Sequence, residues 1–235
     1  MNTTSPIIVA LDFPSEYETM QLVDQLEPSL CRLKVGKELF TRCGPSLVKQ
    51  LVDKNFDVFL DLKYHDIPNT VAQACSAAAD LGVWMLNVHA LGGEKMMQAA
   101  RQVLEVKASS GQQAPLLIAV TWLTSSGQAE LDALGISSTP QQMVSRLAVM
   151  TKNAGLDGIV CSAQEAAHLR KDFKEDFLLV TPGIRLADSQ ADDQCRVVTP
   201  EKAIQDGASY LVIGRPITKA ADPCKVLRTI ISDIG

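Results

Sequence analysis

The chain has 235 residues, of which 46% are hydrophobic and 21% charged, and its formal net charge is -5. This composition is typical of a globular protein with a sizeable core. No Lys/Arg-rich run stands out, so the sequence gives no electrostatic support for binding to nucleic acid or to an anionic membrane surface. No run approaches the roughly 20 apolar residues that a membrane-spanning helix needs.

Short apolar runs alternate with helical patterns from one end of the chain to the other. The expected strands are Ile7–Leu11, Arg32–Val35, Val58–Leu62, Met85–His89, Leu116–Thr121, Gly158–Cys161, Leu178–Thr181 and Tyr210–Ile213. Between the strands lie amphipathic stretches with apolar residues at i, i+3 and i+4, which predict helices. The clearest of these are Tyr17–Leu26, Leu47–Lys54, Thr70–Leu81 and Met143–Ala154.

This alternation indicates the fold class. Eight strand signals, each followed by a helix signal, favour a parallel sheet built from right-handed βαβ units. Eight units close a (β/α)8 TIM barrel of about 250 residues, whose active site lies at the C-terminal ends of the strands. We therefore predict a single (β/α)8 barrel domain over residues 1–235, without a linker. The alternative is an open doubly wound sheet, but no G-x-G-x-x-G motif follows the first strand.

Two connections are longer than a compact barrel requires. Ser125–Pro140 is rich in Ser and Gly and contains a short helical piece at Gln128–Leu134, and Leu186–Asp193 is polar and acidic. Loops of this length inside a compact domain are often functional lids, and we expect this of both connections.

The cysteine pattern and the N-terminus predict a cytoplasmic protein. The six cysteines are scattered without a C-x-x-C pair, so reduced thiols are expected rather than a disulfide scaffold or a zinc site. The segment MNTTSPIIVALDF lacks the basic region and long apolar run of a signal peptide.

Charged residues gather in the segment FLDLKYHDIPNT, which begins as an apolar strand. Side chains alternate in a strand, so Phe59, Asp61 and Lys63 are expected on one face, and Asp66 follows as the strand ends. Asp12 and Lys34 stand at the ends of the first two strands. Buried charges are costly unless they are paired, so this array indicates a functional site.

The last two strands carry a different signal. VTPGIR ends at Arg185 and VIGRPI contains Gly214 and Arg215. Loops after strands 7 and 8 of barrels commonly bind phosphate. A glycine lets the backbone approach an anion, and an arginine grips its oxygens with a planar fork. The three histidines, His65, His89 and His168, share no metal-ligand spacing, and we expect no metal.

The motifs resemble those of orotidine 5′-monophosphate decarboxylases. DLKYHDIPNT (Asp61–Thr70) is similar to the family's D-x-K-x-x-D signature. ALDF, LKVGKELF, VTWLTS, TPGIR and IGRPIT occur in the family's order over the whole chain. The length resembles that of the short bacterial form. This resemblance implies a lyase of pyrimidine biosynthesis that converts orotidine 5′-monophosphate to UMP without a cofactor.

The resemblance also implies roles for individual residues. Lys63, Asp61, Asp66 and Lys34 would be catalytic, with Lys63 as the proton donor. Asp66 would reach into the site of a neighbouring subunit, so that a homodimer completes each site. The expected substrate-binding residues are Asp12, Lys34, Asp61, Ile67, Thr70, Thr124, Arg185, Gln194, Gly214 and Arg215.

Two other functions are compatible with parts of the pattern. A Mg²⁺-dependent phosphosugar decarboxylase or aldolase of the same barrel superfamily would share Asp61, Lys63 and Asp66 and would need further carboxylates near the sugar. A non-catalytic nucleotide-binding barrel would need the phosphate loops, but it would not need the array of aspartates and lysines.

Overall fold

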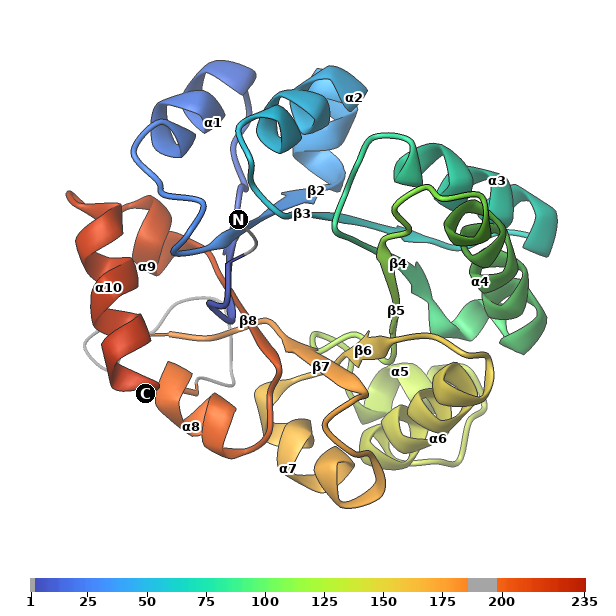
Figure 1. Ribbon diagram of the computed structural model, residues 1–235. Helices are drawn as coiled ribbons and strands as arrows, with labels where there is room; N and C mark the ends of the chain where they lie inside the picture. Colours follow the sequence, from blue (N-terminus) through green and yellow to red (C-terminus); the bar gives the residue numbers. More distant parts are fainter. Residues whose placement is uncertain (1–2, 186–197) are drawn as a thin grey trace.

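The computed structural model describes residues 3–185 and 198–235, which form a closed parallel barrel (Figure 1). Strands pair in chain order, and the last strand closes onto the first. Their bounds are β1 Ile7–Ala10, β2 Arg32–Gly36, β3 Val58–Tyr64, β4 Met85–His89, β5 Leu116–Val120, β6 Gly158–Val160, β7 Leu178–Thr181 and β8 Tyr210–Ile213. The predicted (β/α)8 fold is confirmed, and the open sheet is not formed.

Helices surround the barrel on its outer side (Figure 1). Their bounds are α1 Glu16–Val23, α2 Lys37–Asp53, α3 Pro68–Ala79, α4 Glu94–Ser109, α5 Gln128–Ala133, α6 Pro140–Asn153, α7 Ala163–Asp172, α8 Pro200–Gln205, α9 Arg215–Thr218 and α10 Pro223–Asp233, with a 3₁₀ turn η1 at Ala90–Gly92. Within the described ranges, none of these helices is long and apolar enough to cross a membrane.

Alternation along the strands divides the apolar residues into two layers. On β4, Met85 belongs to the cluster that fills the barrel, whereas Leu86 and Val88 belong to the larger core under the helices. The barrel cluster also contains Phe59 and Ile118, so the interior is packed with side chains. Both faces of each strand are therefore buried, which explains the nearly continuous apolar runs of the sequence.

Helix ends follow ordinary capping chemistry. Ser15 caps α1, Thr139 caps α6, Thr199 caps α8 and Asp222 caps α10, each by accepting a hydrogen bond from a backbone N–H of the first turn. Proline follows the cap directly in the last three of these helices, where its fixed φ and missing N–H are tolerated.

Arg32, the first residue of β2, lies in the barrel interior at the N-terminal end of the strands. Its guanidinium lies 4.4 Å from the ring centre of Trp84 and 5.0 Å from that of Tyr210. It forms an ion pair of 3.2 Å with Asp57 and donates to the carbonyls of Thr3 and Ser5. This buried cation lies among a carboxylate, two carbonyls and two aromatic faces at the barrel's N-terminal end.

Candidate active site

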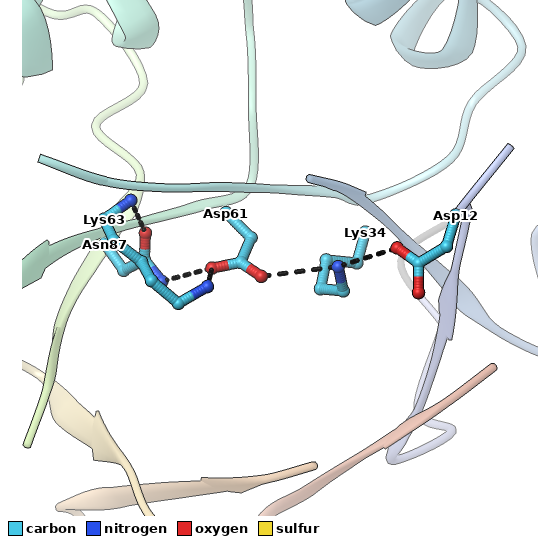
Figure 2. Close-up of polar contacts among 5 residues, drawn as sticks. All are labelled: Asp12, Lys34, Asp61, Lys63 and Asn87. Atoms are coloured by element: carbon cyan, nitrogen blue, oxygen red, sulfur yellow. Dashed lines mark hydrogen bonds and ion pairs between the residues drawn. The ribbon is translucent and has the colours of Figure 1, made fainter. Parts of the chain in front are cut away.

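Four charged side chains form a continuous row across the C-terminal end of the barrel (Figure 2). Lys34 Nζ lies 3.4 Å from Asp12 Oδ1 and 3.3 Å from Asp61 Oδ2. Lys63 Nζ lies 2.5 Å from Asp61 Oδ1. The charges alternate in sign along the row, so each buried ion has an opposite charge beside it.

The barrel strands bring these residues together from distant parts of the sequence. Lys34 belongs to β2 and Asp61 to β3, and Asp12 follows β1 by two residues. In the parallel register, Ala10 pairs with Lys34, and Lys34 pairs with Phe59, two residues before Asp61. The row therefore depends on the strand register.

Lys63 departs from the strand geometry that the sequence predicts. Its φ is +52°, a left-handed conformation that non-glycine residues rarely adopt. The register between β3 and β4 also shifts between Leu60 and Tyr64. Phe59, Asp61 and Lys63 do line one cavity as expected, but simple alternation is not what directs Lys63 into it.

A residue that the sequence analysis did not consider, Asn87 of β4, joins this row (Figure 2). Its Nδ2 donates to Asp61 Oδ1 at 2.7 Å, and its Oδ1 accepts from the backbone N–H of Lys63 at 2.8 Å. The sequence does contain a signal for Asn87, because it is a polar residue at an inward-facing position of an apolar strand, two residues after Met85.

The Asp61 carboxyl is held in its charged form. Burial alone would raise its pKa, but the positive charges of Lys34 and Lys63, with hydrogen bonds from Lys63 and Asn87, outweigh burial and lower the pKa below its usual value. Asp61 is therefore an anion at neutral pH, and it pairs with a lysine on each side.

His65 and His89 stand together next to the site. Their rings stack with centroids 5.5 Å apart. Burial, followed by the charges of His65, Lys37 and Lys63, lowers the pKa of His89 to about 4. His89 is therefore neutral at neutral pH.

The Lys63 end of the row opens into a largely apolar cavity of about 210 Å³. Phe59, Val120 and Val160 contribute apolar surface, and Trp122 and Thr124 contribute from the segment after β5. Lys63 and Thr124 therefore add polar groups to a mostly apolar lining.

The other end of the row opens into a cavity of about 290 Å³. It shares Lys34 and Asp61 with the first cavity and is also lined by Arg185, Gly214 and Arg215. A Cβ added to Gly214 would lie at an ordinary van der Waals distance, 3.7 Å, from the Ala10 Cβ in this lining. Two guanidinium groups make this end suited to an anion.

The remaining predicted residues lie apart from the row. Asp66, Ile67 and Thr70 are exposed around the start of α3, and Asp66 Oδ1 accepts from the Ile67 N–H at 2.6 Å. Gln194 and the expected lid Leu186–Asp193 lie outside the described residues. Within the part of the chain that is described, no three His, Cys, Asp or Glu side chains are grouped to hold a metal ion.

Comparison with known proteins agrees with this arrangement. The model of the orotidine 5′-phosphate decarboxylase / HUMPS family matches residues 5–230. The chain belongs to this family. The resemblance inferred from the motifs is confirmed.

Similar family members match this chain over nearly their whole length. Orotidine 5′-phosphate decarboxylase of Nitrosococcus oceani is 60% identical over 231 residues, which cover 98% of each chain. That of Haemophilus influenzae strain Rd is 60% identical over 232 residues, covering 99% of this chain and all of the relative.

A similar solved structure supports the fold. The crystal structure of orotidine 5′-phosphate decarboxylase from Lactobacillus acidophilus has a TM-score of 0.87 and 38% identity, covering 98% of this chain and 99% of that one. The family match and the structural similarity therefore both extend over nearly the whole sequence.

Proposed function

We propose that this protein is a carbon–carbon lyase that decarboxylates orotidine 5′-monophosphate to UMP, with Lys63 and Asp61 at the reacting carbon. The observation that carries the proposal is the Asp61–Lys63 ion pair at the mouth of an apolar cavity, next to a second cavity lined by two arginines. Relatives at 60% identity over nearly the full length are decarboxylases of this name.

The chemistry explains why an ammonium is needed at this place. When CO₂ leaves C6 of the orotate ring, the electron pair of the broken bond stays on C6, and no adjacent carbonyl can accept it. A fixed Lys63 ammonium stabilises this developing negative charge electrostatically. It then donates a proton to C6, which forms the C6–H bond of UMP, and the lysine regains a proton from solvent.

Asp61 has two roles in this proposal. Its charge pairs with the Lys63 ammonium and directs it toward the cavity. The same charge lies close to the substrate's carboxylate in the bound complex, and the repulsion between them eases as CO₂ departs. Lys34 neutralises the other carboxylate oxygen of Asp61, and Asp12 with Lys34 would contact the ribose hydroxyls.

The 5′-phosphate would occupy the cavity lined by Arg185, Gly214 and Arg215. Binding energy from this non-reacting group supports the chemistry, because it holds the ring against Lys63 and helps to exclude water. Gln194 and the segment Leu186–Asp193 are proposed to complete this part of the site.

We further propose a homodimer in which Asp66 of one subunit completes the site of the other. Asp66 is exposed in the single chain, and the adjacent Ile67 is 66% exposed, so both are accessible to a second subunit. Leu91, after the His65–His89 stack, is another large apolar side chain that is 43% exposed.

A single domain over residues 1–235, a cytoplasmic location and independence from cofactors are also part of the proposal. The described cysteines are free thiols, as a reducing compartment would keep them. The Mg²⁺-dependent alternative is not favoured by the decarboxylase relatives, although the family's description includes HUMPS proteins.

The decisive test is an absorbance assay with purified protein and orotidine 5′-monophosphate. We expect the absorbance change of conversion to UMP, with a rate that is unaffected by EDTA. No conversion at micromolar enzyme would refute the activity. Conversion that EDTA abolishes and Mg²⁺ restores would instead support the metal-dependent chemistry.

A further inference from the structure

Asn87 occupies the place where β3 and β4 lose their regular pairing. Leu60 pairs with Leu86 and Tyr64 pairs with Val88. Three residues of β3, Asp61 to Lys63, therefore lie opposite the single residue Asn87. Such a bulge leaves backbone groups without ladder partners and redirects a side chain.

The Asn87 side chain supplies the missing partners. It is completely buried, and both halves of its amide are used, the oxygen by the Lys63 N–H and the nitrogen by the Asp61 carboxylate. Only one orientation of the amide satisfies both groups, because the N–H needs an acceptor and the carboxylate needs a donor. Both the oxygen and the nitrogen of the Asn87 amide therefore form hydrogen bonds with residues of the bulge.

The bond to Lys63 acts on a strained residue. With φ at +52°, Lys63 holds a conformation that persists only where the surroundings enforce it. The hydrogen bond from its N–H to Asn87 is a direct constraint of this kind, at 2.8 Å. The direction of the Lys63 side chain follows from this backbone conformation.

We propose that Asn87 is a positioning residue that sets Lys63 and Asp61 for proton transfer, by holding the left-handed backbone of Lys63 and one oxygen of the Asp61 carboxylate. The inference rests on the proposed roles of Lys63 and Asp61. It adds that the reactive geometry is imposed from β4, through a neutral amide which takes no part in the proton transfer itself.

The first test replaces Asn87 with an apolar residue of similar volume. Asn87→Leu leaves the Lys63 N–H without its acceptor and Asp61 without one donor. We expect kcat to fall by about 100-fold, because small displacements of catalytic groups have effects of this size. Affinity for UMP should stay within about threefold, because the proposed phosphate contacts lie after β7 and β8, away from Asn87.

The second test uses protonation to restore the bonding pattern. In Asn87→Asp, a neutral carboxyl at position 87 would accept from Lys63 N–H and donate to Asp61, as the amide does. The proton would stay on the new carboxyl, because Lys34 and Lys63 hold Asp61 ionised. The ratio of variant to wild-type kcat should therefore rise about tenfold as the pH falls from about 8 to 5.

A matched control separates this role from a general loss of buried polarity. Thr151→Val removes a buried hydroxyl that donates to the Leu147 carbonyl in α6, away from the site. It should retain wild-type kcat and the wild-type pH profile. A kcat of Asn87→Leu within about threefold of wild type would overturn the proposal. A ratio of Asn87→Asp kcat to wild-type kcat that does not change with pH would also overturn the proposal. This second test remains valid even if Asn87→Leu does not fold.

An additional readout does not depend on turnover. Hydrogen exchange of the Lys63 amide should be fast in Asn87→Leu and protected in wild type and in Asn87→Asp at low pH. If the wild-type protein fails to convert orotidine 5′-monophosphate, the proposed function is refuted. Hydrogen exchange of the Lys63 amide then still tests whether Asn87 holds the Lys63 backbone. Equal protection in all three proteins would refute it.

Discussion

Lys34 and Asp61 form the most enclosed ion pair of the site, with Nζ and Oδ2 3.3 Å apart and side chains only 11% and 12% exposed. Each is also in contact with a further charge, Asp12 and Lys63 respectively. Removing one member of such a pair leaves an uncompensated buried charge, which is more costly than the pair itself is favourable. The row therefore responds as a unit to substitution and to pH.

Asp61→Asn should destabilise the protein at neutral pH and much less in acid. The folded-state pKa of Asp61 is lowered, so its contribution to stability is present above the unfolded-state pKa of about 4 and is lost as the pH falls through the lower folded-state value. We expect a deficit of about 3 kcal/mol at pH 7 that shrinks at pH 3. Urea unfolding of both proteins at the two pH values measures this, and a constant deficit would contradict it.

Lys63→Ala should abolish decarboxylation while UMP still binds. The variant loses both the charge that stabilises the carbanion and the proton donor, so we expect kcat to fall by at least about 1,000-fold. The absorbance assay and calorimetric titration with UMP check the two parts. Lys54→Ala is the matched control, because Lys54 pairs with Asp24 on the surface. Substantial turnover by Lys63→Ala would refute its role.

Arg215→Ala should weaken catalysis through the phosphate and leave the fold intact. Remote binding energy supports the chemical step, so kcat/KM for orotidine 5′-monophosphate should fall by at least about 100-fold. Steady-state kinetics and circular dichroism provide the measurements. Arg228→Ala, which breaks an exposed ion pair with Glu27, should behave as wild type. Near-normal kinetics for Arg215→Ala would remove the phosphate assignment.

Mixing two inactive variants should restore activity if Asp66 acts across a dimer. In a hybrid of Lys63→Ala and Asp66→Ala subunits, one site carries both substitutions and the other carries neither. Random exchange of equal amounts then restores roughly a quarter of the wild-type sites. Activity measured after co-refolding tests this. No recovery, with hybrid dimers verified by mass spectrometry, would place Asp66 outside the partner's site.

Arg32→Leu should reduce stability without changing kcat. The guanidinium lies between Trp84 and Tyr210 and pairs with Asp57 at the end of the barrel opposite to the site. Loss of the charge leaves Asp57 without its partner, and we expect unfolding to become about 3–5 kcal/mol easier. Denaturant titration and the absorbance assay measure the two quantities. A reduced kcat in the folded variant would show that the two ends of the barrel are coupled.

The barrel strands could be located from the sequence because their burial on both faces leaves a clear apolar run. Met85–His89, Leu178–Thr181 and Tyr210–Ile213 have the predicted bounds. The end of β3 was predicted two residues too early, at Leu62 instead of Tyr64, because a bulge continues the strand through charged residues. Helix α2 begins at Lys37, ten residues before the amphipathic pattern that was recognised, and contains a break at Gly44.

By itself, the sequence determined the fold and the family and indicated the aspartates, lysines and arginines proposed for the site, since these depend on periodicity and on motifs within short segments. Tertiary structure decided how they meet. The contact of Lys34 with Asp61 depends on the register of β2 with β3, and the conformation of Lys63 on a bulge opposite Asn87. Neither is visible in a local pattern, because each arises from pairing between strands that are distant in the chain.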